Sequence, residues 1–197
     1  MASFYPAYQL VAKAEGGYQR IPEDSGNYNS RGDLVGTNWG ISAPVYEDWI
    51  GRPPSTKDMQ NISLLTAHQI YKSRFWDDID GDSIQSQEVA NIFFDGRVNH
   101  GRTGTKLMQK VLGVNVDGVV GNQTLSAINR ANPTSLFNRY KAARRQFYYD
   151  IVNRKPSQRI FLNGWLNRLN KFEIKAAAAG SLFLIGLGLV LFYGFRD

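Results

Sequence analysis

The sequence predicts a mainly α-helical protein that ends in a membrane-spanning helix. Apolar residues recur at three- and four-residue spacing along much of the chain, which is typical of helices with one buried face. Capping residues, glycines and prolines divide these stretches into separate helices. The third observation is the segment "AAAAGSLFLIGLGLVLFYGF", residues 176–195, which carries no charge. Its length is about the 20 residues that a helix needs to cross a bilayer core.

The first predicted helix begins after Ser3, which can cap it, and ends at the Gly16-Gly17 pair. Residues 18–40 are rich in Gly, Asn, Ser and Asp, so we expect a long loop or a small irregular hairpin there. Helical patterns follow at about 43–50, 63–75 and 84–98. The last of these has the widest apolar arc, and we expect it to be the most buried.

Two short helices come next, in "TGTKLMQKVLG" and "GNQTLSAINRA". A long amphipathic helix then begins at Pro133, and Pro156 breaks it. A final helix contains Phe161, Trp165 and Phe172 and leads without a break into the apolar tail.

Composition excludes several kinds of site. The 197-residue chain has no cysteine, so it has no disulfide, thiolate metal ligand or cysteine nucleophile. Its two histidines do not form a ligand-spaced pair, so we expect no metal site. The start, "MASFYPAYQLVAKAEGG", lacks the basic and apolar regions of a signal peptide.

Positive charge is concentrated in the later part of the chain. Residues 133–175 contain ten Lys or Arg and two acidic residues. Such a segment suits an anionic wall polymer or an anionic lipid surface. No nucleic-acid recognition motif accompanies it, so we expect no nucleic-acid partner.

Glu15 and Asp24 are candidates for acid–base chemistry. Glu15 lies at the predicted C-terminus of a helix, where the helix dipole disfavours the ionised carboxylate and so favours a proton donor. Asp24 follows nine residues later in a polar loop, and glycosidic cleavage needs two such differing groups. Each also has an ordinary alternative: Glu15 as a solvated helix end, and Asp24 as an Asx turn.

Four segments together resemble the glycoside hydrolase family 108 muramidases, which are related to phage-type lysozymes and include the "secretion activator protein" group. They are "EGGY", "DSGN", "GTNWGIS" and "FFDGRVNHG", and the resemblance covers roughly residues 5–172. It implies a lysozyme-like helical fold that hydrolyses the bond between N-acetylmuramic acid and N-acetylglucosamine, without a cofactor.

The resemblance also implies roles for individual residues. Glu15 matches the general acid of the family, and Asp24 and Thr37 resemble the Asp and Thr that hold a water on the far side of the sugar. The insertion "NYNSRGDLV" lengthens the step to Thr37, which is therefore the less secure match. Asp33, within the insertion, is a rival second carboxylate, and Glu23 is a weaker one.

Asp95 and Asn99 are candidate substrate contacts. Because they lie four residues apart, they share a helix face and can hydrogen-bond each other or a sugar hydroxyl. Arg97 stands between them, where the family usually has a small residue.

Aromatic rings that could stack on sugars form a second set of substrate contacts. Trp39, inside the "GTNWGIS" segment, is the best candidate, and the others are Tyr18, Tyr28 and Trp76. We expect Trp49 and Trp165 to lie in the core because both fall on apolar helical faces.

The segment "LMQKVLGVNVDGVVGNQTLSAI", residues 107–128, resembles a small peptidoglycan-binding domain. We therefore predict a lysozyme-like catalytic region at 1–102, a peptidoglycan-binding-like region at 103–174 and a transmembrane tail at 175–197. The predicted function is a membrane-anchored N-acetylmuramidase whose partners are peptidoglycan and, through residues 176–195, a lipid bilayer. One setting that fits is a phage lysin in the membrane of a virion. The alternative is an inactive wall-binding or assembly protein on the same fold.

Overall fold

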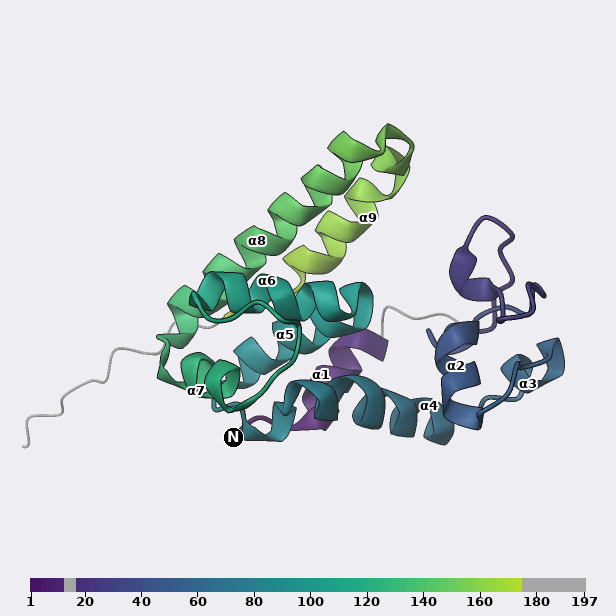
Figure 1. Cartoon of the computed structure of the whole chain (residues 1–197), viewed down its shortest axis with the longest axis horizontal. Helices are drawn as coiled ribbons and strands as arrows, with labels where there is room; N and C mark the ends of the chain where they lie inside the picture. Colours follow the sequence, from purple (N-terminus) through teal and green to yellow (C-terminus); the bar gives the residue numbers. More distant parts are fainter. Residues whose placement is uncertain (13–16, 175–197) are drawn as a thin grey trace, which may run out of the picture.

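The computed structural model describes residues 1–12 and 17–174, and it confirms a mainly helical chain (Figure 1). Within these residues, β pairing is limited to three isolated bridges between residues 19 and 41. The α-helices are α1 (Phe4–Ala12), α2 (Ala43–Ile50), α3 (Thr56–Gln60), α4 (Leu64–Tyr71), α5 (Gln87–His100), α6 (Arg102–Leu112), α7 (Asn122–Arg130), α8 (Pro133–Arg154) and α9 (Arg159–Asn170). Shorter helical turns are Ser25–Asn27, Lys72–Trp76, Asp77–Ile79, Gly81–Ser83 and Pro156–Gln158.

Helix α5 is the centre of the larger body, and α1, α6 and α8 pack around it (Figure 1). It begins where the Ser86 hydroxyl accepts a hydrogen bond from the Val89 amide. Seven of its residues between Val89 and Gly96 are buried, in agreement with the wide apolar arc of the sequence. The largest side chains among them, Phe93 and Phe94, are fully buried.

Two glycines allow α5, α6 and α8 to approach closely. A Cβ atom on Gly104 of α6 would overlap the backbone carbonyl of Gly96 on α5. A Cβ atom on Gly96 would overlap the hydroxyl of Tyr140, which lies on α8. That hydroxyl donates a hydrogen bond of 3.1 Å to the Gly104 carbonyl, so one side chain joins all three helices.

Helices α8 and α9 form a hairpin that projects from the body (Figure 1). The Asn132 side chain caps α8 by accepting a 2.9 Å hydrogen bond from the Ser135 amide, and Pro133 occupies the first turn. Pro156 lies in the short turn between the two helices. The predicted start and break of the long helix are therefore both observed.

Residues 18–60 form a smaller lobe that includes α2 and α3, and α4 leads from it to the body (Figure 1). Helix α3 is not expected from apolar periodicity because it has only five residues. A capping box forms it: the Ser55 hydroxyl accepts from the Asp58 amide, and the Asp58 carboxylate accepts from the Ser55 amide.

The helix predicted over residues 63–75 ends at Tyr71 and continues as a π-helical turn, Lys72–Trp76. Trp76 is fully buried, and its indole N–H donates a 2.8 Å hydrogen bond to Asp82. Its ring also packs against Phe94 of α5, with centroids 5.6 Å apart. The prediction that Trp76 could stack on a sugar is therefore wrong, because the π turn directs its ring into the core.

The predicted transmembrane helix, residues 176–195, lies outside the part of the chain that the structure describes. Among residues 1–12 and 17–174, no helix has the length and apolar character needed to cross a bilayer.

The contact between α5 and α6 can be tested with one methyl group. Gly104→Ala should lower the free energy of unfolding by about 1–3 kcal/mol, because the added carbon meets backbone rather than a movable side chain. Urea denaturation would measure the change. The matched control is Gly164→Ala in α9, where an added carbon meets nothing and alanine is the better helix former. Equal stability of the two variants would contradict the proposed packing.

Candidate active site

The loop of residues 18–41 carries most of the predicted catalytic and stacking residues, and backbone pairing holds its two ends together. The backbone N–H of Gln19 donates to the Thr37 carbonyl, and the N–H of Thr37 donates to the Gln19 carbonyl, each at 2.8 Å. Within the loop, the backbone carbonyl of the buried Asn27 accepts hydrogen bonds from the backbone amides of Val35 and Gly36. The loop is thus a small irregular hairpin, one of the two forms that its composition predicts.

Asp24 and Thr37 meet at a single residue, Gly26. The Asp24 carboxylate accepts a 2.8 Å hydrogen bond from the Gly26 amide, while the Thr37 hydroxyl lies 3.5 Å from the Gly26 carbonyl oxygen. Asp24 is exposed, and its second carboxylate oxygen has no hydrogen-bond partner among the described residues. Thr37 is buried. The two groups predicted to hold a water therefore both bond the backbone of Gly26, and one oxygen of Asp24 is left available.

Glu15 lies outside the described residues, which break off after Ala12 and resume at Gly17. The structure describes the chain on both sides of it. Helix α1 packs against α5 in the body, and Gln19 pairs with Thr37 in the smaller lobe. Only two residues, Gly17 and Tyr18, separate the end of the gap from Gln19.

Asp33, the rival carboxylate, contributes to the turn in which it lies. Its side chain accepts a 3.0 Å hydrogen bond from the Asn29 amide group, and its own backbone N–H donates to the Asn29 side-chain oxygen at 3.0 Å. The same Asn29 side chain donates to the carbonyl of Pro54, which ties this turn to the segment before α3. Asp24 has a comparable local role, because its carboxylate caps the turn Ser25–Asn27, as the Asx-turn alternative predicts.

Trp39 offers an aromatic face on a fixed support. Its backbone has a φ of 52°, and its indole N–H donates a 2.9 Å hydrogen bond to the carbonyl of Ile62. The side chain remains 37% exposed, so a sugar ring can reach it. Tyr18 and Tyr28 are half-buried, and each hydroxyl bonds a carbonyl within the loop, that of Val35 at 2.9 Å and that of Pro22 at 3.0 Å.

Asp95 does not face a site that a glycan could reach. It is fully buried, and its carboxylate forms ion pairs with Arg144 of α8 at 2.6 Å and with Arg168 of α9 at 2.8 Å. Burial alone would raise the pKa of Asp95, but the two guanidinium charges more than offset this and hold the pKa below its usual value. The prediction of Asp95 as a substrate contact therefore conflicts with its burial.

Asn99 and His100 border this buried ion cluster. The Asn99 amide donates to the Asp95 carboxylate at 3.0 Å, which confirms the expected hydrogen bond between them, while Asn99 itself is exposed. His100 lies 3.1 Å from the Tyr148 hydroxyl. Burial, and then the nearby charge of Arg144, lower the pKa of His100 to about 4, so its imidazole is neutral at physiological pH.

Arg144 and Arg168 are the charged residues that the sequence-based reasoning missed. A signal for Arg144 was present, because it lies between Tyr140 and Tyr148 at four-residue spacing on the buried face of α8. An arginine on such a face needs a buried acidic partner. Arg97, the departure from the family pattern, pairs with Asp78 at 2.6 Å instead.

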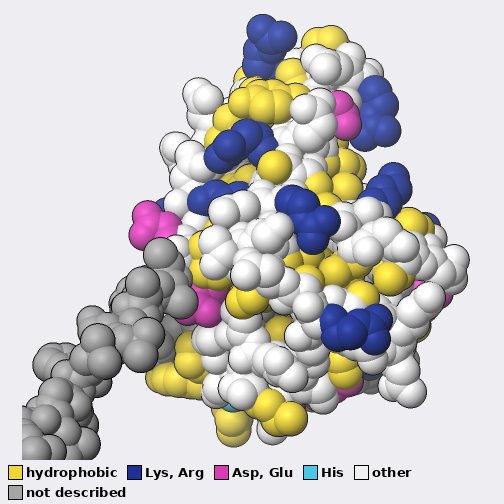
Figure 2. Space-filling view, turned by 90° about the vertical axis from the view of Figure 1, so that its left-hand side faces the viewer, with side chains coloured by type: hydrophobic (Ala, Val, Ile, Leu, Met, Phe, Trp, Pro, Cys, Tyr) yellow, Lys and Arg dark blue, Asp and Glu magenta, His cyan; other side chains and the backbone are white. Residues whose placement is uncertain are grey.

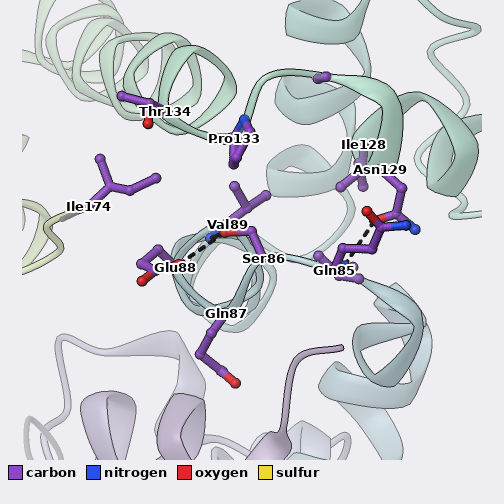
Figure 3. A pocket seen from close by; sticks show the side chains of 12 residues that line it. Gln85, Ser86, Gln87, Glu88, Val89, Ile128, Asn129, Pro133, Thr134 and Ile174 are labelled. Atoms are coloured by element: carbon purple, nitrogen blue, oxygen red, sulfur yellow. Dashed lines mark hydrogen bonds between the residues drawn. The ribbon is translucent and has the colours of Figure 1, made fainter. Parts of the chain in front are cut away.

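A pocket of about 460 Å³ opens at the start of α5, far along the chain from the predicted site (Figure 3). It lies between the residues around Gln85, the end of α7 and the start of α8. Several of its polar groups bond one another. The backbone N–H of Gln85 donates to the side-chain oxygen of Asn129 at 2.9 Å, and the Ser86 hydroxyl donates to the Glu88 carboxylate at 3.1 Å. None of the predicted site residues lines it.

Two known families match most of the chain. Residues 8–101 match the family described as Glycosyl hydrolase 108. Over these residues the chain is similar to glycoside hydrolase family 108. Residues 103–170 match a second family, described as Predicted Peptidoglycan domain, which makes peptidoglycan the expected partner. The resemblance stated from the sequence motifs is thus confirmed.

Among solved structures, that of Brucella abortus SagA is similar, with a TM-score of 0.68 and 26% sequence identity. The match covers 89% of this chain and 98% of that chain. A search of curated proteins found no match.

The buried ion cluster of Asp95, Arg144 and Arg168 predicts a loss of stability when its carboxylate is removed. Asp95→Asn should lower the free energy of unfolding by about 3–5 kcal/mol, because it leaves two arginines facing a neutral amide, one of them fully buried. The control is Asp78→Asn, which breaks the partly exposed pair with Arg97 and should cost about 1 kcal/mol or less. Chemical denaturation of both variants measures the difference, and a mild Asp95→Asn phenotype would refute the role of the cluster.

Proposed function

We propose that this chain is a family 108 N-acetylmuramidase that cleaves the glycan of bacterial peptidoglycan. In this proposal Glu15 donates a proton to the leaving glycosidic oxygen, and Asp24 holds a water or stabilises the oxocarbenium-like transition state. Thr37 positions Asp24 and the water through the shared Gly26 segment. Trp39 stacks on a sugar ring, and the exposed Asn99 and the half-buried Tyr18 are further contacts.

The observation that carries the proposal is the meeting of Asp24 and Thr37 at Gly26, in a loop whose pairing begins four residues after Glu15. Asp24 is preferred to Asp33 because it shares Gly26 with Thr37, whereas the side chain of Asp33 bonds Asn29. No step needs a metal or an organic cofactor, because a carboxylic acid and a carboxylate suffice for this chemistry.

The proposal assigns catalysis to residues 1–102 and wall binding to residues 103–174. One hydrophobic core runs through both regions, since Phe94 and Met108 belong to the same buried cluster. The two regions therefore divide the function while sharing a single folded core.

Glu15→Gln should reduce hydrolysis by about 100- to 10,000-fold, because the amide keeps the shape of the side chain but cannot donate the proton. Asp24→Asn should also reduce it strongly, and Thr37→Ala less. The measurement is the release of soluble fragments from purified sacculi, with mass analysis of the new reducing ends. A muramidase leaves N-acetylmuramic acid at those ends.

Two charge-matched variants serve as controls. Asp33→Asn and the distant Glu173→Gln should each retain nearly full activity. Full activity of Glu15→Gln would sink the assignment of the acid, and an inactive Asp33→Asn with an active Asp24→Asn would reverse the choice of carboxylate. A wild-type protein that binds sacculi without cleaving them would favour the wall-binding alternative.

We also propose that residues 176–195 anchor the protein in a bilayer, with a virion membrane as one setting. The support is their sequence: they carry no charge, and Lys171 and Lys175 precede them.

The anchor predicts how the full chain behaves on fractionation. In a host that makes the protein, the full chain should remain in the membrane fraction through washes with high salt and with carbonate, and residues 1–174 should not. Immunoblotting of the fractions measures both. Release of the full chain by either wash would rule out a spanning helix and leave surface adsorption.

A further inference from the structure

A groove between α6 and α8 has the composition of a binding site. It has a volume of about 460 Å³ and lies within the region that matches the peptidoglycan domain. Leu107 of α6 and Phe147 of α8, both half-buried, form its apolar part. Lys106, Lys110 and Arg154 supply its positive charge.

These three cations have no acidic partner among the described residues. Lys106 and Lys110 are exposed and lie one helical turn apart on α6, so their charges face the same side. Arg154 donates to the backbone carbonyl of Asp150 at 3.2 Å. The Asp150 carboxylate accepts from Gln146 at 2.9 Å and is the one acidic side chain that lines the groove. The groove therefore has an excess of positive charge.

Some cations of the catalytic region, in contrast, have acidic partners. Arg52 pairs with Asp58, Arg74 with Asp48 and Arg97 with Asp78. On the face of the molecule drawn in Figure 2, Lys and Arg side chains are spread widely and acidic side chains are few. Paired cations have a partner within the chain, whereas unpaired cations beside an apolar groove favour an anionic ligand from outside.

We propose that this groove binds the carboxylate-bearing peptide stems that branch from the wall glycan. The inference rests on the proposed wall substrate and names the part of the wall that this region recognises. Lysine ammonium groups and a guanidinium attract the stem carboxylates, and Leu107 and Phe147 contact the aliphatic parts of the stem. Gln146 and Thr103 also line the groove and can bond the peptide amides.

The recessed shape favours a peptide over a membrane surface. A bilayer is met by a protruding face with exposed apolar side chains, whereas Leu107 and Phe147 are half-buried between two helices. A stem held here would keep the enzyme on the wall while the separate loop of residues 18–41 engages the glycan.

The test is co-sedimentation of the full-length chain with purified sacculi, in a Glu15→Gln background so that the ligand stays intact. Lys106→Glu combined with Lys110→Glu should weaken binding roughly 10-fold or more, and the remaining binding should depend less on salt. The matched control is Lys57→Glu with Lys171→Glu, an equal charge change at exposed residues outside the groove, which should leave binding unchanged. Equal thermal midpoints would show that both doubly substituted proteins are folded.

The ligand is identified by varying the wall. The Glu15→Gln protein with an intact groove should bind sacculi stripped of their stems by an amidase as weakly as the groove variant binds intact sacculi. Sacculi with amidated carboxylates should give the same result, and removal of wall phosphate polymers should change nothing. Undiminished binding to stem-free sacculi would overturn the proposal, as would a groove variant that loses affinity for anionic vesicles and not for walls.

This result is separate from the test of catalysis. Cleavage by the wild-type protein, together with no effect of the groove substitutions, would reject the stem site and leave the muramidase proposal intact. Stem-dependent binding without any new reducing ends would support the groove and reject the hydrolase.

Discussion

The buried ion cluster of Asp95, Arg144 and Arg168 is the interaction on which the body of this protein depends. It joins α5, α8 and α9 through a carboxylate and a guanidinium that are fully buried and a second guanidinium that is 19% exposed. Burying such charges is costly, and it is tolerated only where each charge has a close partner of opposite sign. Both carboxylate oxygens of Asp95 are engaged, and Arg144 also donates to the Ile92 carbonyl at 3.1 Å. These bonds connect both helices of the α8–α9 hairpin to α5.

Close packing of α5, α6 and α8 also holds the helices of the body together. Helices α5 and α6 touch through their glycines, and the Tyr140 hydroxyl connects α8 to both of them. Helix α1 then packs on the opposite part of α5 and leads toward Glu15.

The smaller lobe combines buried apolar side chains, such as Val35 and Ile41, with hydrogen bonds from buried amide side chains. Buried amide side chains connect its loops: Asn29 reaches the Pro54 carbonyl, and Asn38 reaches the Met59 carbonyl at 2.9 Å. The indole of Trp39 bonds Ile62 just before α4, so the loop that carries Asp24 and Thr37 is tied to the helix that leads into the body. Polar bonds to backbone suit a substrate loop, since they position it without requiring a large apolar core.

The sequence by itself determined the helical class, the resemblance to the family and the bounds of the long helix α8. Prolines act locally, so Pro133 and Pro156 could be recognised without knowledge of the fold. Asp24 and Thr37 were candidates through the resemblance of their motifs to the family, and the structure brings both to Gly26. Tertiary structure decided which side chains are accessible. Trp39 and Trp76 are both aromatic candidates by sequence, yet one is 37% exposed and the other is buried by a π turn. Asp95 looked like a sugar contact because helical spacing reveals its neighbour Asn99, but its partner Arg168 lies 73 residues away. Contacts over such a separation arise only when the helices pack, so periodicity along the chain carries no information about them.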